Sequence, residues 1–237
     1  MNTESNSYTF LFATVMVLVV ASTLAFTASS LKAKQEENIR KEKMQSILKT
    51  IGIITDRDGA ENLYKEYIKR ELSLDGKGEI DNSVSAFSIK LIREIKKPVS
   101  EQRFPIFVGE VENNKYYIIP IRGAGLWDAI WGYIALKEDK KTIKGVIFGH
   151  KSETAGLGAE ITQEWFQNRF KDEKIFDSEG ELVGISVSKT NNDPKNMDKN
   201  DHEVDAISGA TITGDGVTDM IIERLEHYLP YFNKLDL

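Results

Sequence analysis

An apolar run near the start of the chain predicts a membrane-spanning helix. No residue between Glu4 and Lys32 is charged, and the run from Tyr8 to Ala28 is almost entirely apolar. At 1.5 Å per residue, a helix over this run would be roughly 32 Å long, enough to cross a bilayer's hydrocarbon core. A buried core helix and a cleaved signal peptide are the alternatives, but a signal peptide has a basic segment before a shorter apolar run. We therefore predict an uncleaved anchor in residues 1–31 that contacts lipid through residues 8–30.

After the anchor, the hydrophobic pattern changes between helical and strand periodicity. Apolar positions recur at helical spacing in four segments, which are residues 32–52, 61–72, 160–170 and 214–229. Short β-rich runs separated by turn residues occupy residues 84–89, 105–111, 115–121, 129–136, 142–149 and 181–189. The polar segment 191–202 is rich in residues that break regular structure. The order predicts an α+β fold with antiparallel strands flanked by helices. We expect an anchor (1–31), a helical linker (32–80) and one soluble domain (81–237).

Composition excludes several classes of function. The chain has 31 Lys and Arg against 37 Asp and Glu, a net charge of −6, which argues against nucleic-acid binding. The absence of cysteine excludes disulfides, thiolate metal sites and a cysteine nucleophile. His150, His202 and His227 lie far apart in the sequence, so we predict no metal site and assign these residues no role. Neither G-x-G-x-x-G nor a Walker lysine pattern occurs, and no catalytic residue is predicted.

The most informative motif is Asp205-Ala-Ile-Ser-Gly-Ala-Thr211. One interpretation is a turn of small residues that caps the last helix. The other is the acceptor sequence for covalent flavinylation, Asp-x-x-Ser/Thr-Gly-Ala-Thr, in which the final threonine carries FMN through a phosphoester. Five specified positions match by chance in on the order of one chain in a few thousand, which favours the second interpretation.

Together with the anchor, three motifs make the chain resemble the C subunits of the sodium-translocating NADH:quinone oxidoreductases. The other two motifs are Gly123-Ala-Gly-Leu-Trp127 and Glu153-Thr-Ala-Gly-Leu-Gly158. Ala155 stands where many relatives have proline, and the polar segment near residue 191 is longer than expected. The resemblance implies an FMN-carrying electron-transfer subunit of a complex that couples NADH oxidation and quinone reduction to sodium export. The alternatives are the G subunit of the related Rnf complex, and a non-redox assembly module.

The resemblance also implies a flavin site built from these motifs. FMN would be attached to Thr211, at the N-terminus of the last helix, where backbone N–H groups favour an anion. We expect one wall of the flavin pocket from the acceptor segment and another from the glycine-rich loop that begins at Glu153. The Gly123–Trp127 motif would provide an apolar edge, and a lysine would raise the flavin's potential. These residues are Ser208, Gly209, Ala210 and Thr213; Glu153, Thr154, Gly156, Leu157 and Gly158; Leu126 and Trp127; and Lys189. A flavin transferase with FAD as donor would attach the FMN, and Asp205 is either its recognition element or a brace of the turn.

Charge and resemblance disagree about the orientation in the membrane. Basic residues follow the apolar run and none precedes it, which favours a cytoplasmic soluble domain. The resemblance implies the opposite, with the domain on the periplasmic side of a bacterial inner membrane among other subunits of a respiratory complex. Because long domains translocate despite flanking charge, we expect the periplasmic side.

Overall fold

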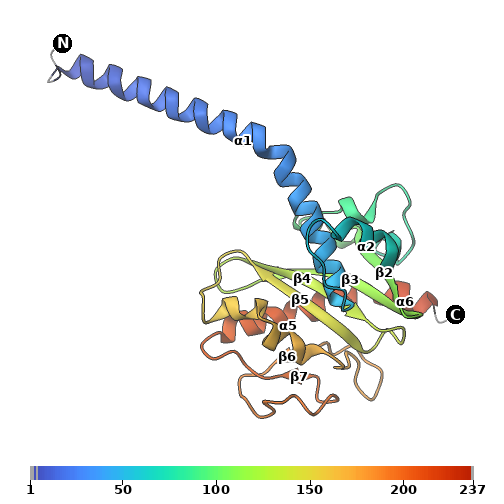
Figure 1. The fold of residues 1–237 in the computed structure, drawn as a ribbon. Coiled ribbons are helices and arrows are strands. Elements are labelled where there is room, and N and C mark those ends of the chain that lie inside the picture. Colours follow the sequence, from blue (N-terminus) through green and yellow to red (C-terminus); the bar gives the residue numbers. More distant parts are fainter. Residues whose placement is uncertain (1–2, 4, 236–237) are drawn as a thin grey trace. The chain divides into compact units, whose positions relative to one another are not determined.

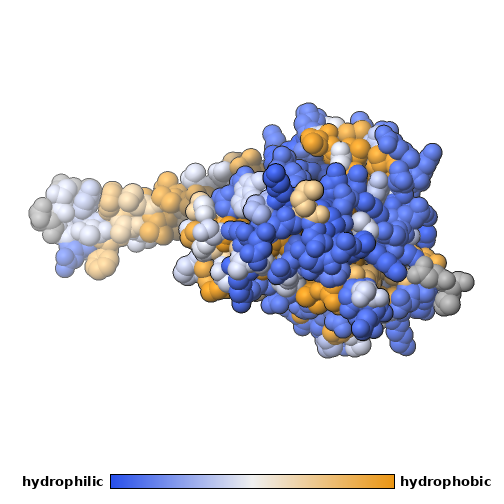
Figure 2. Space-filling view, turned by 90° about the horizontal axis from the view of Figure 1, so that it is seen from below, coloured by the Kyte–Doolittle hydropathy of each residue, from blue (hydrophilic) through white to orange (hydrophobic). Residues whose placement is uncertain are grey.

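The computed structural model describes residue 3 and residues 5–235, which fall into two compact units whose boundary in the sequence lies between Lys43 and Met44. Helix α1 (Asn6–Thr50) begins in the first unit and ends in the second. The predicted span and the helix predicted over residues 32–52 form one continuous helix rather than two separate elements. Among the described residues, α1 is the one helix long and apolar enough to cross a membrane. Its hydrophobic side chains are exposed in the first unit (Figure 2).

The second unit is built on a five-stranded antiparallel sheet in the order β1-β2-β3-β4-β5. The strands are β1 (Ile68–Leu74), β2 (Phe104–Val111), β3 (Asn114–Ala124), β4 (Ala129–Leu136) and β5 (Ile143–His150). Two further strands, β6 (Ser186–Val187) and β7 (Glu203–Val204), form a short parallel pair. The helices of this unit are α2 (Ala60–Tyr67), η1 (Ala86–Ser88), α3 (Leu91–Glu94), η2 (Val99–Glu101), η3 (Gly158–Thr162), α4 (Glu164–Gln167), η4 (Asn168–Phe170), α5 (Thr211–Glu226) and α6 (Leu229–Leu235).

Each face of the sheet buries its own hydrophobic core. Consecutive strand residues point to opposite faces, so Ile118 joins one core and Ile119 the other. The first core lies under α2, η1 and the end of α1, where Met44 and Ile47 pack near Phe107. The second core lies under α5, α6 and η3–η4. Figure 1 shows α2 and α5 on opposite faces of the sheet. The α+β expectation is therefore confirmed. β3 and β5 both pair with β4, and α5 packs against β3, so these elements are held close together.

Several predicted elements differ from the structure. The segment 61–72 is helical only to Tyr67, and its second half is β1, because pairing with β2 overrides the helical spacing. The run 84–89 is not a strand but contains η1, and 160–170 is broken into η3, α4 and η4. The run 181–189 forms only the two residues of β6.

The last helix and the segment 32–80, which was expected to be helical, also differ in secondary structure from the prediction. The last helix begins earlier, at Thr211, and is followed by the separate helix α6. The boundary between the compact units lies between Lys43 and Met44 in the sequence, and β1, which falls in the expected linker 32–80, is part of the sheet. Residues 44–80 therefore contribute to the folded domain.

Candidate functional site

Segments far apart in sequence converge on one pocket of about 230 Å³. They are the turn between β3 and β4, the loop after β5, and the N-terminus of α5. The turn closes where the Gly125 N–H donates to the Asp128 carbonyl at 2.8 Å. The residues that line the pocket are Leu126, Glu153, Thr154, Leu157, Gly158, Gly209, Ala210, Thr211, Ile212 and Thr213. Nine of these were predicted; Ile212 was missed, although it directly follows the predicted acceptor residue.

A buried carboxylate connects these segments. Glu153 is only 7% exposed, and its Oε2 accepts a hydrogen bond from the Thr213 hydroxyl at 2.7 Å. Its Oε1 accepts from the backbone N–H of Trp127 at 3.0 Å. Thr213 lies in the first turn of α5 and is 1% exposed. One side chain from the loop after β5 therefore holds both the β3–β4 turn and the start of α5.

Two glycines leave the space that this carboxylate occupies. A Cβ on Gly125 would lie 2.5 Å from Glu153 Oε1, and a Cβ on Gly158 would lie 2.5 Å from Oε2 and equally close to Thr213 Oγ1. Gly156 differs, because its φ of +76° favours glycine while no atom would contact an added Cβ. Gly158 has no positive φ, so its requirement for glycine comes from packing alone.

The N-terminus of α5 presents an exposed hydroxyl beside unused backbone donors. Thr211 is exposed and is the first residue of the helix. The first helical hydrogen bond runs from Gly214 N–H to the Ala210 carbonyl at 2.9 Å, so the N–H groups of residues 211–213 precede the helical ladder. This arrangement favours an anion at the helix start. Thr213 offers no comparable hydroxyl, because its side chain is buried against Glu153.

Asp205 is buried in the structure and braces the segment before the acceptor turn. Its Oδ1 accepts from the backbone N–H of Asp193 at 3.2 Å, and its carbonyl accepts from Arg169 Nη1 at 2.9 Å. Asn196 then donates to the Arg169 carbonyl at 2.6 Å. The polar segment 191–202, rich in residues that break regular structure, is thus tied to the acceptor segment. No local pattern predicts a role for Arg169 or Asn196, because their partners lie more than 25 residues away in the sequence.

The remaining predicted residues lie near the pocket or outside its lining. Trp127 is exposed next to Leu126, and Ser208 is exposed at the acceptor turn. Lys189 lies outside the lining and forms a long 3.9 Å ion pair with Asp215. His150 has a turn role, because its Nδ1 accepts from the Glu153 N–H at 3.1 Å.

One ion pair sets the charge at the β3–β4 turn. Lys151 Nζ donates to Asp128 Oδ2 at 2.7 Å. This hydrogen bond, with a second from the Ala129 N–H, holds the pKa of Asp128 below its ordinary value. The Asp128 carboxylate thereby links the β3–β4 turn, which carries Leu126 and Trp127, to Lys151 just after β5.

Comparisons with known proteins point to one family. The model of the FMN-binding domain family matches residues 125–226, which include all three pocket segments. The chain is 30% identical to the C subunit of the Na(+)-translocating NADH-quinone reductase of Neisseria meningitidis serogroup A, over 98% of this chain and 95% of that protein. It is 28% identical to the corresponding subunit of Yersinia pestis, over 91% and 87%. The crystal structure of the C subunit from Parabacteroides distasonis superposes with a TM-score of 0.75 at 36% identity, covering 85% of this chain and 96% of that one.

Proposed function

The chain belongs to the family of Na(+)-translocating NADH-quinone reductase C subunits, and we propose that it carries FMN as a phosphoester on Thr211. The chain is an FMN-carrying electron-transfer subunit of this oxidoreductase complex, with a single-pass membrane anchor. Neither the Rnf alternative nor a non-redox assembly module is favoured, since the named relatives are all C subunits of one kind of complex.

The residues at the pocket fit this group. The apolar side chains of Leu126, Leu157 and Ile212 provide surface for the flavin ring. The N–H groups at the start of α5 provide donors for a phosphate, and the exposed Thr211 hydroxyl is the attachment point. When bound, FMN supplies the electron-transfer chemistry. The protein holds FMN in a pocket whose lining includes exposed side chains, where neighbouring subunits can approach it.

The observation that carries the assignment is the contrast between two neighbouring threonines. Thr211 is exposed and lines the pocket, whereas the hydroxyl of Thr213 is buried and donates to Glu153. In the transfer, Thr211 Oγ1 forms a bond to the FMN phosphorus of FAD, the pyrophosphate bond breaks, and AMP leaves with the hydroxyl proton going to solvent. The product is heavier than the unmodified chain by the mass of FMN less one water.

Intact mass and in-gel flavin fluorescence of the denatured protein test this assignment. We expect Thr211→Ala to lose both the added mass and the fluorescence while it remains folded. Thr213→Ser, which keeps the hydroxyl donor to Glu153, should retain both. A Thr211→Ala protein that still fluoresces after denaturation would place the flavin on another residue. A wild-type protein that shows no flavin fluorescence after co-expression with the transferase would support the assembly-module alternative.

Asp205 is better suited to bracing the acceptor turn than to direct recognition by the transferase. Its side chain is buried, whereas Ser208, Gly209 and Thr211 are exposed. We propose that the transferase reads the exposed residues and that Asp205 sets their conformation through the contacts with Asp193 and Arg169. On this view Asp205→Asn, which keeps one acceptor oxygen, should be flavinylated faster than Asp205→Ala.

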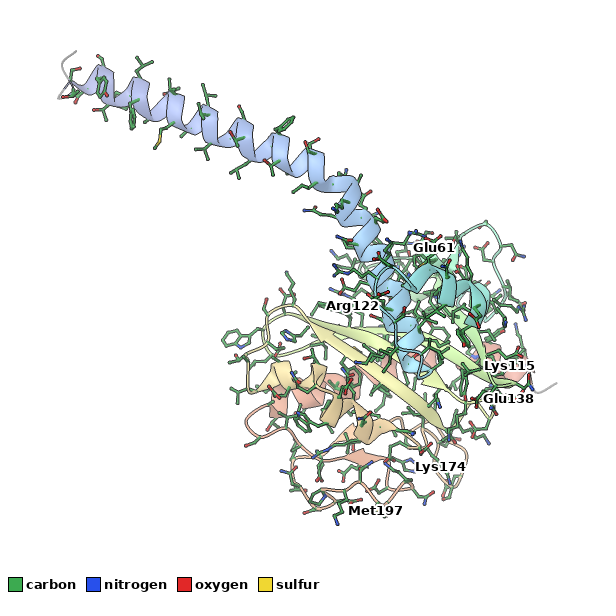
Figure 3. The ribbon with its side chains drawn as sticks, viewed as in Figure 1. Glu61, Lys115, Arg122, Glu138, Lys174 and Met197 are labelled. Carbon is green, nitrogen blue, oxygen red and sulfur yellow. The ribbon has the colours of Figure 1, made fainter. Side chains whose placement is uncertain are left out.

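We also propose that the soluble domain lies on the periplasmic side of the inner membrane. The absence of cysteine permits a direct test with a membrane-impermeant maleimide on intact cells. Met197→Cys is the probe in the domain, because Met197 is 76% exposed and lies at the periphery of the domain (Figure 3), whereas the adjacent Asn196 is buried. Labelling of Met197→Cys but not of Asn6→Cys is expected. The reverse pattern would show that the charge bias after the apolar run determines the orientation.

A further inference from the structure

The connection between β1 and β2 exposes alternating aliphatic and basic side chains. The chain from residue 75 to 103 forms η1, α3 and η2. Within it, Ile92, Ile95 and Val99 are 48%, 36% and 51% exposed. Exposed cations alternate with these side chains in the sequence. We define the basic–apolar patch as Lys90, Ile92, Arg93, Ile95, Lys96 and Val99.

The patch is the outer side of a segment whose inner side is firmly held. Glu94 is buried and accepts from Lys97 Nζ at 2.7 Å and from the Arg103 backbone N–H at 2.9 Å. Gln102, also buried, donates to the Lys97 carbonyl at 2.8 Å. Arg103 Nε forms an ion pair with Asp81 at 2.6 Å. Because these contacts fix the backbone, the outward position of the aliphatic side chains is a property of the fold.

The cations of this segment fall into two groups, those held in ion pairs within the fold and those of the patch. Lys97 and Arg103 are engaged with Glu94 and Asp81. The three cations of the patch are exposed, and among the described residues none of them has an ion pair. Aliphatic side chains among unpaired cations match a surface that offers phosphate charge above an apolar layer.

The patch follows η1 in the chain, and η1 packs on the sheet face at which the chain enters the domain. Met44, the first residue of the second unit, belongs to the same core as Ala86 of η1, in the connection that carries the patch. Only about a dozen residues separate the predicted span from Met44, so the domain cannot move more than about 40 Å from the bilayer even with that stretch fully extended. A lipid surface is therefore always within reach, at high effective concentration.

We propose that the basic–apolar patch docks the domain on the anionic phospholipid surface of the membrane in which the chain is anchored. Lys90, Arg93 and Lys96 contact lipid phosphates, and the three aliphatic side chains enter the headgroup layer. Each cation near an anionic surface strengthens such binding roughly fivefold. The inference rests on the membrane anchor and is independent of the flavin attachment.

The test uses the full chain in lipid nanodiscs, with the fluorophore NBD on Val99→Cys. In nanodiscs of phosphatidylcholine with about 30% phosphatidylglycerol, we expect blue-shifted emission and quenching by nitroxide-labelled lipid. In pure phosphatidylcholine the quenching should be weak. Charge reversal of the patch cations (K90E, R93E and K96E together) should weaken docking by more than about a hundredfold and abolish the lipid-dependent quenching.

The matched control reverses three exposed lysines elsewhere in the domain, K141E, K171E and K195E, with the same change in net charge. We expect this variant to retain quenching in anionic nanodiscs. Equal loss in both triple variants would mean that net charge alone acts, and quenching that ignores lipid charge would also overturn the proposal. A label shielded only in the assembled complex would make the patch a protein interface instead. Thermal unfolding of each variant verifies that the domain remains folded.

Discussion

Truncating Glu153 should disconnect the segments that form the pocket. In Glu153→Ala, the buried Thr213 hydroxyl and the Trp127 N–H both lose their acceptor. Hydrogen bonds to a charged group contribute about 1.5–3 kcal/mol each. Removing the carboxylate also relieves the cost of burying its charge, so we expect a net loss of about 3 kcal/mol in the free energy of unfolding. For a domain of this size, that corresponds to a fall in Tm of about 6–12 °C.

The assay is thermal unfolding of the full chain in detergent, followed by far-UV circular dichroism, with the visible flavin spectrum as a second readout. Glu153→Gln keeps an acceptor and the shape of the side chain, so it should lose less stability than the alanine variant. Glu179→Ala, at an exposed position, is the control and should change the stability by less than about 0.5 kcal/mol. The flavin should stay attached in all of them, but Glu153→Ala should show an altered spectrum, because both walls of its pocket become mobile.

A double-mutant cycle shows whether the carboxylate acts through Thr213. If the contact is real, Glu153→Ala and Thr213→Val should be non-additive by about 0.5–3 kcal/mol, since each removes the same hydrogen bond. Additive effects, or a Glu153→Ala protein with unchanged Tm and unchanged spectrum, would refute the role of Glu153 as a connection between the segments.

Three further outcomes follow from other contacts. Gly158→Ala should lower Tm by several degrees, because its Cβ would lie 2.5 Å from the Glu153 carboxylate; an unchanged melting curve would show that the loop yields freely. Asp205→Ala should accelerate proteolysis within residues 191–202 with little change in global Tm, and unaltered cleavage would remove its bracing role. Hydrogen bonds from the Ser83 side chain and N–H, then from Arg103, lower the pKa of Asp81 to about 2. Its stabilisation is therefore present above about pH 4 and lost toward pH 2, so Asp81→Asn should flatten the fall in Tm over that range, as acid titration would show.

The sheet was largely predictable because its signals are local. The runs 105–111, 115–121, 129–136 and 142–149 are short, rich in β-branched and aromatic residues and bounded by turn residues, and they became β2 to β5 with shifts of at most a few residues. β1 was missed because Ile68 and Leu72 also fit a helical stripe. Its strand conformation depends on pairing with β2, whose residues lie 30 or more positions further along the chain. A pattern within one segment carries no information about such a partner.

The candidate site divides in the same way. The acceptor motif and the glycine-rich loop were identified because their spacing is local and specific, and the structure brings them into one pocket. The function of Glu153 was not, because its partner Thr213 lies 60 residues away. Glu153 was predicted as part of the pocket wall; it lines the pocket, and its carboxylate also connects the segments around it. The prediction for Lys189 remains a prediction, with its ammonium group now located near Asp215.

The distance in sequence between these contacts has a consequence for how the pocket forms. The β3–β4 turn, the loop after β5 and the start of α5 are each short irregular or terminal segments, which by themselves are mobile. The Glu153 carboxylate, which belongs to the loop after β5, accepts hydrogen bonds from both the β3–β4 turn and the start of α5. Ordering any one of these segments therefore lowers the entropic cost of ordering the next. The pocket should therefore order as a unit, and hydrogen exchange should detect this. In Glu153→Ala, protection should fall together at the Trp127 and Gly214 amides, although they lie almost 90 residues apart. Loss confined to Trp127, the direct partner of the carboxylate, would show that the segments order independently.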